Sequence, residues 1–235
     1  MFLLLWISFG ACAEDWRILG DEKFAPYSYL GQDGRTPQGH DVELVKAVLD
    51  EANINYQLQL YPWQRLISLL SKDAATAAFP FVDSPERRSQ FELVGPIRYG
   101  RTAFIVSCNV NLTDWKSFND LAPFTIGQVR GYAYEGNFDK APLSRNTQAN
   151  NPRQLVSMLL AGRIDVIVGD QAQLMYWIKL ENAQHQVRVL PTPLVIMPRY
   201  VGFSKKNADS ARIFAEALER LRQNGTLEQL HMELQ

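Results

Sequence analysis

Apolar residues recur along the chain with two different spacings, and segments of the two kinds alternate. The run INYQLQLY at 54–61 alternates apolar and polar residues, which predicts a strand with one buried side. The run DVELVKAVLDEA at 41–52 places Val42, Val45, Val48, Leu49 and Ala52 on one helical face. By the same criteria we predict strands at 16–20, 54–61, 76–81, 124–129, 164–169, 187–190 and 200–204, and helices at 41–52, 63–71, 153–161, 173–181 and from 209 onward.

This order of elements predicts an α/β fold with largely parallel sheets. Residues 66–81 and 155–170 each contain an amphipathic helix, a short turn and an apolar strand, and they overlie each other without gaps. The repeat favours two similarly built lobes. Ligands of open α/β sheets collect beyond the carboxyl ends of strands, and the repeat places two such ends at Phe81 and Asp170.

The stretch FPFVDSPERRSQF at 79–91 begins as a strand and ends in a helix start that carries two arginines. Ser84 is suited to be the N-cap, and Pro85 suits the first helical position. Positive charge in a first turn is unusual, because the free N–H groups there favour an anion. The guanidinium of Arg87 could bind a carboxylate with two parallel hydrogen bonds, or the turn could be an ordinary exposed one.

Asp170 directly follows the apolar strand at 164–169 and therefore has two possible roles. It could be the N-cap of the next helix, or it could accept hydrogen bonds from a ligand ammonium. If both charged groups bind a ligand, Arg87 and Asp170 would hold the two ends of a zwitterion across two lobes.

Aromatic residues gather in the loops that follow the predicted strands. Phe24, Tyr27 and Tyr29 follow the first strand, Trp63 the second, and Tyr132 the strand at 124–129. Their ring faces could cover the side chain of a ligand, or they could belong to the core.

Composition excludes several classes of function. The chain has 46% hydrophobic and 21% charged residues and a formal net charge of −1, so no basic surface predicts nucleic acid as a partner. The three histidines are isolated, and the sequence contains no metal-binding spacing, nucleophile elbow or phosphate-binding glycine loop. We therefore expect no metal, no cofactor and no enzymatic activity.

The N-terminal residues 1–13, MFLLLWISFGACA, resemble an export signal. Their apolar run is too short to span a bilayer, and Ala11-Cys12-Ala13 fits a signal-peptidase site. Acylation at Cys12 or a buried N-terminal strand would be alternatives. We expect a soluble, exported mature protein in which Cys108, after the apolar run AFIVS, is a buried thiol.

Several of these motifs together resemble the family 3 extracellular solute-binding proteins, which serve polar amino acid ABC importers. The similarity is carried by FAPYSY, GHDVELVKAV, PWQRLISLL, SPERRSQF, IGQVRGY, LLAGRIDVIVGD and NGTLEQL, in this order. It implies a two-lobed, type II periplasmic-binding-protein fold with two hinge crossings. Lobe 1 would comprise 14–98 and 195–235, and lobe 2 would comprise 99–194.

The resemblance also implies a binding site. Arg87 falls where family members bind the ligand α-carboxylate, and Asp170 where they bind the α-ammonium. Phe24 and Trp63 match aromatic positions of the side-chain pocket. Tyr132 matches the lobe 2 loop whose amides reach the carboxylate, with Arg130 nearby.

Other positions depart from the family pattern. His40 replaces a usual Phe, Thr76 a usual Asp, and Tyr132 a usual Ser or Thr; residues 80–82, Pro-Phe-Val, replace small polar residues that normally contact the ligand. The anchors for the α-groups are thus kept while the pocket between them is remodelled.

The function implied is a periplasmic, monomeric binder that captures a small amino acid-like zwitterion and delivers it to a membrane ABC permease. Two alternatives stay open: a module that senses a ligand for a membrane receptor, and an enzyme similar to a cyclic-amino-acid dehydratase. The enzyme would need a general acid in the cleft, for which Glu22 and Glu135 are the candidates.

Overall fold

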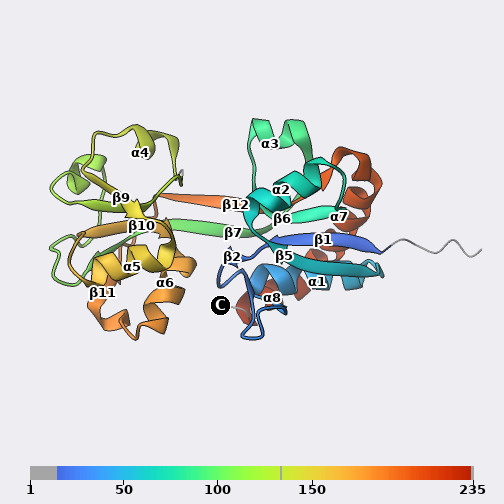
Figure 1. Ribbon diagram of the computed structural model, residues 1–235, viewed down its shortest axis with the longest axis horizontal. Helices are drawn as coiled ribbons and strands as arrows, with labels where there is room; N and C mark the ends of the chain where they lie inside the picture. Colours follow the sequence, from blue (N-terminus) through green and yellow to red (C-terminus); the bar gives the residue numbers. More distant parts are fainter. Residues whose placement is uncertain (1–14, 133, 234–235) are drawn as a thin grey trace, which may run out of the picture.

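A computed structural model describes residues 15–132 and 134–233 and shows two lobes side by side, joined by two long strands (Figure 1). The predicted signal peptide at 1–13 lies outside the described residues. The strands are β1 (Trp16–Asp21), β2 (Lys23–Phe24), β3 (Ser28–Leu30), β4 (Pro37–Gln38), β5 (Tyr56–Tyr61), β6 (Ala77–Val82), β7 (Phe91–Ser107), β8 (Ile126–Val129), β9 (Arg145–Ala149), β10 (Val166–Asp170), β11 (Val187–Val189) and β12 (Val195–Ser204). The α-helices are α1 (His40–Glu51), α2 (Trp63–Ser71), α3 (Pro85–Gln90), α4 (Gly136–Lys140), α5 (Pro152–Leu160), α6 (Gln171–Leu180), α7 (Ala208–Gln223) and α8 (Thr226–Glu233).

The two crossing strands, β7 and β12, form an antiparallel ribbon that belongs to both lobes. On one side, β12 pairs with β6, and the sheet continues through β1 to β5. On the other side, β7 pairs with β10, and the sheet continues through β8 to β9. One hydrogen-bonded path therefore runs through both lobes, and the fold has the two hinge crossings expected. The lobe boundaries at 98/99 and 194/195 stay a prediction.

The lobe that contains β1 is built by the alternation seen in the sequence. Val42, Val45 and Leu49 of α1 pack with Phe214 of α7 under the sheet formed by β5, β1 and β6. Leu66 and Leu70 of α2 cover the opposite face of the same sheet. Burial of these side chains on both sheet faces explains why the central strand β6 is apolar throughout.

The other lobe repeats this arrangement. Leu155 and Leu159 of α5 and Leu174 of α6 cover one face of its sheet. The other face is covered by aromatic residues, among which Phe104 and Phe138 lie 5.5 Å apart. The helix-then-strand repeat of the sequence corresponds to α2 with β6 and α5 with β10.

Every helix and strand predicted from periodicity is present within a few residues. The prediction for Cys108 is wrong, because its side chain is exposed. Strand β7 ends at Ser107, so Cys108 lies in the following turn instead of continuing the apolar run.

Candidate functional site

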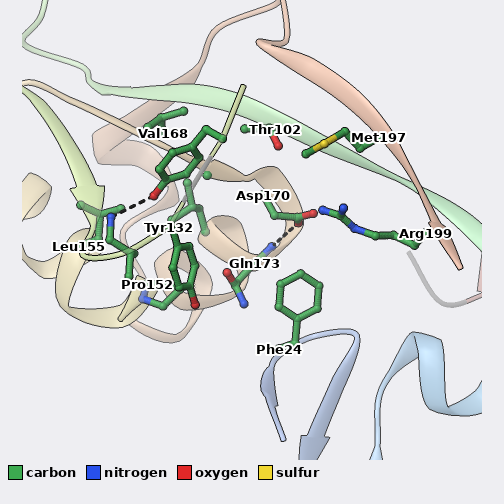
Figure 2. A pocket seen from close by; sticks show the side chains of 14 residues that line it. Phe24, Thr102, Tyr132, Pro152, Leu155, Val168, Asp170, Gln173, Met197 and Arg199 are labelled. Carbon is green, nitrogen blue, oxygen red and sulfur yellow. Dashed lines mark hydrogen bonds between the residues drawn. The ribbon is translucent and has the colours of Figure 1, made fainter. Parts of the chain in front are cut away.

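A pocket lies beside the two crossing strands at the carboxyl end of β10 (Figure 2). Its empty volume is about 480 Å³, which includes space open to solvent. Apolar side chains form most of its wall, and its polar groups come from different elements. The lining residues are Phe24, Thr102, Val129, Tyr132, Tyr134, Pro152, Leu155, Val168, Gly169, Asp170, Gln173, Leu174, Met197 and Arg199.

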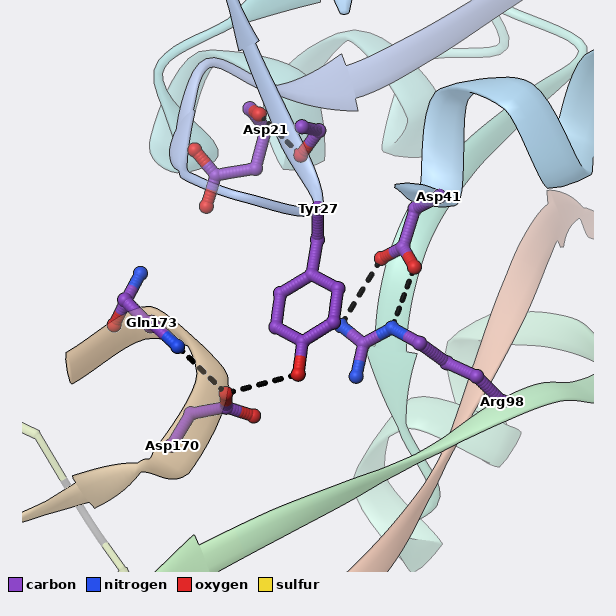
Figure 3. Close-up of polar contacts among 7 residues, drawn as sticks. Asp21, Tyr27, Asp41, Arg98, Asp170 and Gln173 are labelled. Atoms are coloured by element: carbon purple, nitrogen blue, oxygen red, sulfur yellow. Dashed lines mark hydrogen bonds and ion pairs between the residues drawn. The ribbon is translucent and has the colours of Figure 1, made fainter. Parts of the chain in front are cut away.

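Asp170 is the last residue of β10 and also caps α6. Its Oδ1 accepts a hydrogen bond from the backbone N–H of Gln173 at 3.2 Å, as an N-cap does. The same oxygen accepts a hydrogen bond from the hydroxyl of Tyr27 at 3.0 Å. Tyr27 follows β2, so this contact bridges the two lobes (Figure 3). Asp170 is therefore an N-cap, and its second oxygen, Oδ2, stays available in the pocket.

A buried ion pair between Arg98 and Asp41 packs against the ring of Tyr27. Arg98 of β7 donates two hydrogen bonds to Asp41 of α1, from Nε at 2.5 Å and from Nη2 at 3.1 Å. The guanidinium lies 3.4 Å from the ring centroid of Tyr27 (Figure 3). Burial opposes the charge of Arg98, but the Asp41 carboxylate more than offsets it, and the pKa of Arg98 is raised. Burial and then the charge of Asp170 raise the pKa of Tyr27, so its hydroxyl keeps its proton and remains a donor.

Replacing Tyr27 with phenylalanine is expected to lower the free energy of unfolding by about 1.5–3 kcal/mol, because a buried carboxylate loses a hydrogen bond. Urea denaturation followed by tryptophan fluorescence measures the change. Tyr99→Phe is the matched control, since Tyr99 of β7 is 65% exposed and should change stability by less than about 0.5 kcal/mol. Equal effects of the two substitutions would contradict a role for the Tyr27–Asp170 contact.

Arg199 of β12 lies beside Asp170 in the lining of the pocket (Figure 2). The two side chains are buried, and their charges attract each other without a direct ion pair. Burial and then the charge of Arg98 lower the pKa of Arg199. In the described part of the chain, seven buried side-chain atoms have no hydrogen-bond partner in the protein, and four of them line this pocket. Such atoms are rare in folded proteins, so their concentration here makes this pocket the candidate site for a polar ligand.

Three of the residues predicted from sequence line this one pocket: Phe24, Tyr132 and Asp170. Phe24 stacks on Tyr27 with ring centroids 5.4 Å apart. Tyr132 is 49% exposed and lies 6.4 Å from the ring of Tyr134. Arg130 is close in sequence to Tyr132, but its side chain is exposed and does not line the pocket.

The other two, Trp63 and Arg87, lie together on the lobe that contains β6 and do not line this pocket. The Arg87 guanidinium lies 5.7 Å from the ring of Trp63 and 5.8 Å from that of Phe81. Ser84 caps α3 as expected and accepts a hydrogen bond from the backbone N–H of Arg87. The neighbouring Arg88 instead forms an exposed ion pair with Asp83.

The positions that depart from the family pattern have structural contacts of their own. Phe81 is buried between Trp63 and another phenylalanine of the core. Thr76 accepts a hydrogen bond from the backbone N–H of Arg17, and the ring of His40 packs edge-on against that of Tyr27. Thr76 and His40 do not line the pocket at Asp170.

The two candidate general acids are likewise placed outside this pocket. The carboxylate of Glu135 caps α4 and accepts hydrogen bonds from the backbone N–H groups of Asn137 and Phe138. Glu22 lies 3.9 Å from the ammonium of Lys23.

Sequence reasoning missed Arg199, Gln173, Thr102 and Met197 as lining residues. Arg199 lies in an apolar strand, and no local motif surrounds it. Gln173 could have been predicted, because it lies one helical turn after Asp170, at a strand end where the sequence already predicted a ligand site. The hydroxyl of Tyr27 contacts a residue 143 positions away, which no local pattern reports.

Within residues 15–132 and 134–233, no group of three His, Cys, Asp or Glu side chains is arranged to hold a metal ion. Over the same residues, none of the helices combines the length and the apolar character that a membrane span requires.

The comparisons with known proteins agree with the fold and the motifs. The sequence profile of the bacterial extracellular solute-binding proteins, family 3, matches residues 17–233. A probable histidine-binding protein of Neisseria gonorrhoeae is 22% identical over 231 residues, covering 92% of this chain and 81% of the relative. The ABC transporter arginine-binding protein 1 of Escherichia coli K12 is 26% identical over 203 residues, covering 85% of this chain and 80% of the relative.

Solved structures show the same fold. An ABC uptake transporter substrate-binding protein from Streptococcus pneumoniae with bound histidine superposes with a TM-score of 0.76 at 20% identity, covering 94% of this chain and 92% of that one. A histidine kinase sensor domain similar to periplasmic binding proteins superposes with a TM-score of 0.75 at 20% identity, covering 94% of this chain and 95% of that domain.

Proposed function

The chain belongs to the bacterial extracellular solute-binding proteins, family 3, and from this premise we propose that it captures a small amino acid-like solute between its two lobes and delivers it to a membrane ABC permease. Its relatives are named as binding proteins for histidine and for arginine. The observation that carries the proposal is the pocket at Asp170, where unpaired buried polar atoms from one lobe and from a crossing strand meet.

In the proposed complex, Asp170 receives the ligand ammonium through Oδ2, the oxygen without a hydrogen-bond partner in the protein. Arg87 binds the α-carboxylate from the other lobe when the lobes close, and Trp63 and Phe24 cover the ligand side chain. Tyr132 and the neighbouring Arg130 approach from the loop after β8. Residues 14–98 with 195–235 and residues 99–194 move as the two lobes, with β7 and β12 as the hinge.

The protein acts as a monomeric, non-catalytic binder in the periplasm, with residues 1–13 as its signal peptide. Closure around a ligand supplies the difference in affinity that shifts the protein from the open to the closed state. The permease recognises the closed state. Neither a metal nor a cofactor takes part.

A sensory role is the second candidate, because a histidine kinase sensor domain shares this fold. In that case the closed state would be read by a receptor domain and not by a permease. Ligand binding is common to both candidates, whereas transport requires a cognate permease, so uptake of labelled ligand by cells with and without the protein separates them.

A thermal-shift screen of the purified protein against amino acids, amines and small carboxylates tests the proposal. A ligand at 100 times its Kd adds about 2.7 kcal/mol to the free energy of unfolding. The proposal predicts that at least one amino acid raises the melting temperature and binds with 1:1 stoichiometry by calorimetry. A response only to solutes without an amino acid head group would contradict it, and turnover of arogenate would favour the dehydratase-like alternative.

A further inference from the structure

The unpaired atoms in the pocket are mostly donors. Arg199 contributes Nε and Nη1, Gln173 contributes Nε2, and Asp170 contributes the single acceptor Oδ2. All three side chains are more than nine-tenths buried, with exposed fractions of 7% for Arg199, 3% for Gln173 and 9% for Asp170. A ligand that satisfies this pocket must therefore present more acceptors than donors to it.

Arg199 is more than a counter-ion for Asp170. The guanidinium of Arg199 and the carboxylate of Asp170 both approach Gly100, in the crossing strand β7. A β-carbon added to Gly100 would lie 3.2 Å from Nε of Arg199 and 3.2 Å from Oδ2 of Asp170. The absence of a side chain at Gly100 thus leaves room for both charged groups.

A simple zwitterion would leave this arrangement incomplete. With its carboxylate on Arg87 and its ammonium on Asp170, the donors of Arg199 and Gln173 would be desolvated without a partner. An unpaired buried polar group is costly, and an unpaired buried charge costs more. Asp41 attracts Arg199 through its charge, but its hydrogen bonds come from Arg98, so Nε and Nη1 of Arg199 stay without a partner in the protein.

We propose that Arg199 and Gln173 bind a second carboxylate of the ligand, so that the solute is an amino dicarboxylate. This inference rests on the proposed function and names its substrate class. Two guanidinium groups, of Arg87 and Arg199, and one carboxylate, of Asp170, complement a ligand with two carboxylates and one ammonium. A carboxylate offsets the charge of Arg199 and accepts hydrogen bonds from both donors, which an amide oxygen does only in part.

The charges around the pocket also disfavour a ligand with a cationic side chain. A second ammonium or guanidinium in the pocket would lie near Arg199, whose charge is already opposed by burial and by Arg98. Burial and then the charge of Asp21, at the end of β1, raise the pKa of Tyr132, so Asp21 is a carboxyl group near the pocket, although it does not line it. The ligand class inferred therefore differs from those named for the relatives.

Isothermal titration calorimetry tests this with matched ligands: L-aspartate, L-glutamate and L-2-aminoadipate, their amides L-asparagine and L-glutamine, and the cationic L-arginine and L-histidine. We expect an acidic amino acid to bind about 30-fold or more tightly than its amide, the lower range for a desolvated charge pair. Tighter binding of an amide or of a cationic amino acid would overturn the inference and leave the proposed function standing. Binding of no amino acid would overturn both.

Variants then test whether Arg199 binds the second carboxylate of the ligand. Arg199→Met should weaken binding of the acidic ligand about 30-fold or more and change binding of the amide by less than about threefold. Arg101→Gln is the matched control, because Arg101 also lies on a crossing strand but does not line the pocket. Unchanged or tighter binding of the acidic ligand by Arg199→Met would mean that Arg199 only neutralises Asp170, and the inference would fail.

Gln173→Met keeps the inference testable if Arg199→Met does not fold, as judged by circular dichroism. Loss of one donor to a carboxylate should weaken binding of the acidic ligand about tenfold. The amide ligand should be affected less. An equal loss for both ligands would contradict the assignment of Nε2 to a carboxylate.

Discussion

Replacing Asp41 with alanine is expected to lower the free energy of unfolding by about 3–5 kcal/mol, because the substitution leaves the Arg98 guanidinium buried without its partner. The side chain of Asp41 is 0% exposed and that of Arg98 is 5% exposed, so solvent cannot replace the carboxylate. The pair also joins α1 to the crossing strand β7, which makes it part of the hinge. Urea denaturation followed by circular dichroism measures the change.

Two controls separate this effect from the loss of a carboxylate in general. Asp83→Ala breaks the exposed ion pair with Arg88 and should cost less than about 1 kcal/mol. The double variant Asp41→Leu with Arg98→Met should recover most of the loss, because a buried pair replaced by apolar side chains is often neutral. A loss below about 1 kcal/mol for Asp41→Ala would show that the pair contributes little.

Replacing Arg87 with alanine is expected to weaken ligand binding by about 2–5 kcal/mol, or roughly 30-fold to several thousand-fold, since the ligand carboxylate would be buried without its partner. Arg87 lies on α3 in a half-exposed turn, so the fold should tolerate the change. Calorimetry with the best ligand of the thermal-shift screen measures the affinity.

The neighbouring arginine is the control for this prediction. Arg88→Ala removes the same charge from the same helix, but Arg88 is engaged with Asp83 at the surface, so affinity should change by less than about threefold. Similar losses for the two variants would indicate a general effect of charge on the approach of the ligand. Unchanged affinity in Arg87→Ala would remove Arg87 from the site.

The sequence was sufficient to predict what depends on local patterns. Alternating and helical periodicity located α1, β5, α2 and β10, and the Ser84 N-cap was predicted from Ser-Pro-Glu-Arg. These features follow from burial of one face and from capping within a few residues. The repeat likewise predicted two similar lobes, because each helix and strand pair buries its own core.

Features that depend on distant partners were not predictable in this way. Strand β7 contains Gly95-Pro96, which is typical of a break, yet the strand runs over 17 residues, because β12 pairs with it on both sides of a register shift at this point. Arg98 and Arg199 are paired across these strands, so their common position near the pocket appears only in the fold. The Asp41–Arg98 ion pair joins residues 57 positions apart.

The crossing strands β7 and β12 also connect the ligand pocket to the closure of the two lobes. Arg199 and Gly100 belong to the hinge ribbon, and Asp170 belongs to one lobe, while Tyr27 reaches it from the other. A ligand bound to Asp170 and Arg199 therefore touches the hinge ribbon of β7 and β12. It also touches Asp170, whose hydrogen bond with Tyr27 joins the two lobes. Binding at this position can shift the open-closed equilibrium through differential contacts in the two states.

Calorimetric titration of the Asp170→Asn variant with the best amino acid ligand is the most direct test of the site. Asparagine keeps the size of the side chain and the N-cap hydrogen bond but removes the charge that receives the ammonium. We predict a loss of affinity of about 30-fold or more in a protein that still folds, as judged by circular dichroism. The melting temperature should fall, because buried Arg199 loses the negative charge that attracts it. Affinity equal to that of the unsubstituted protein would place the ligand elsewhere and contradict the account.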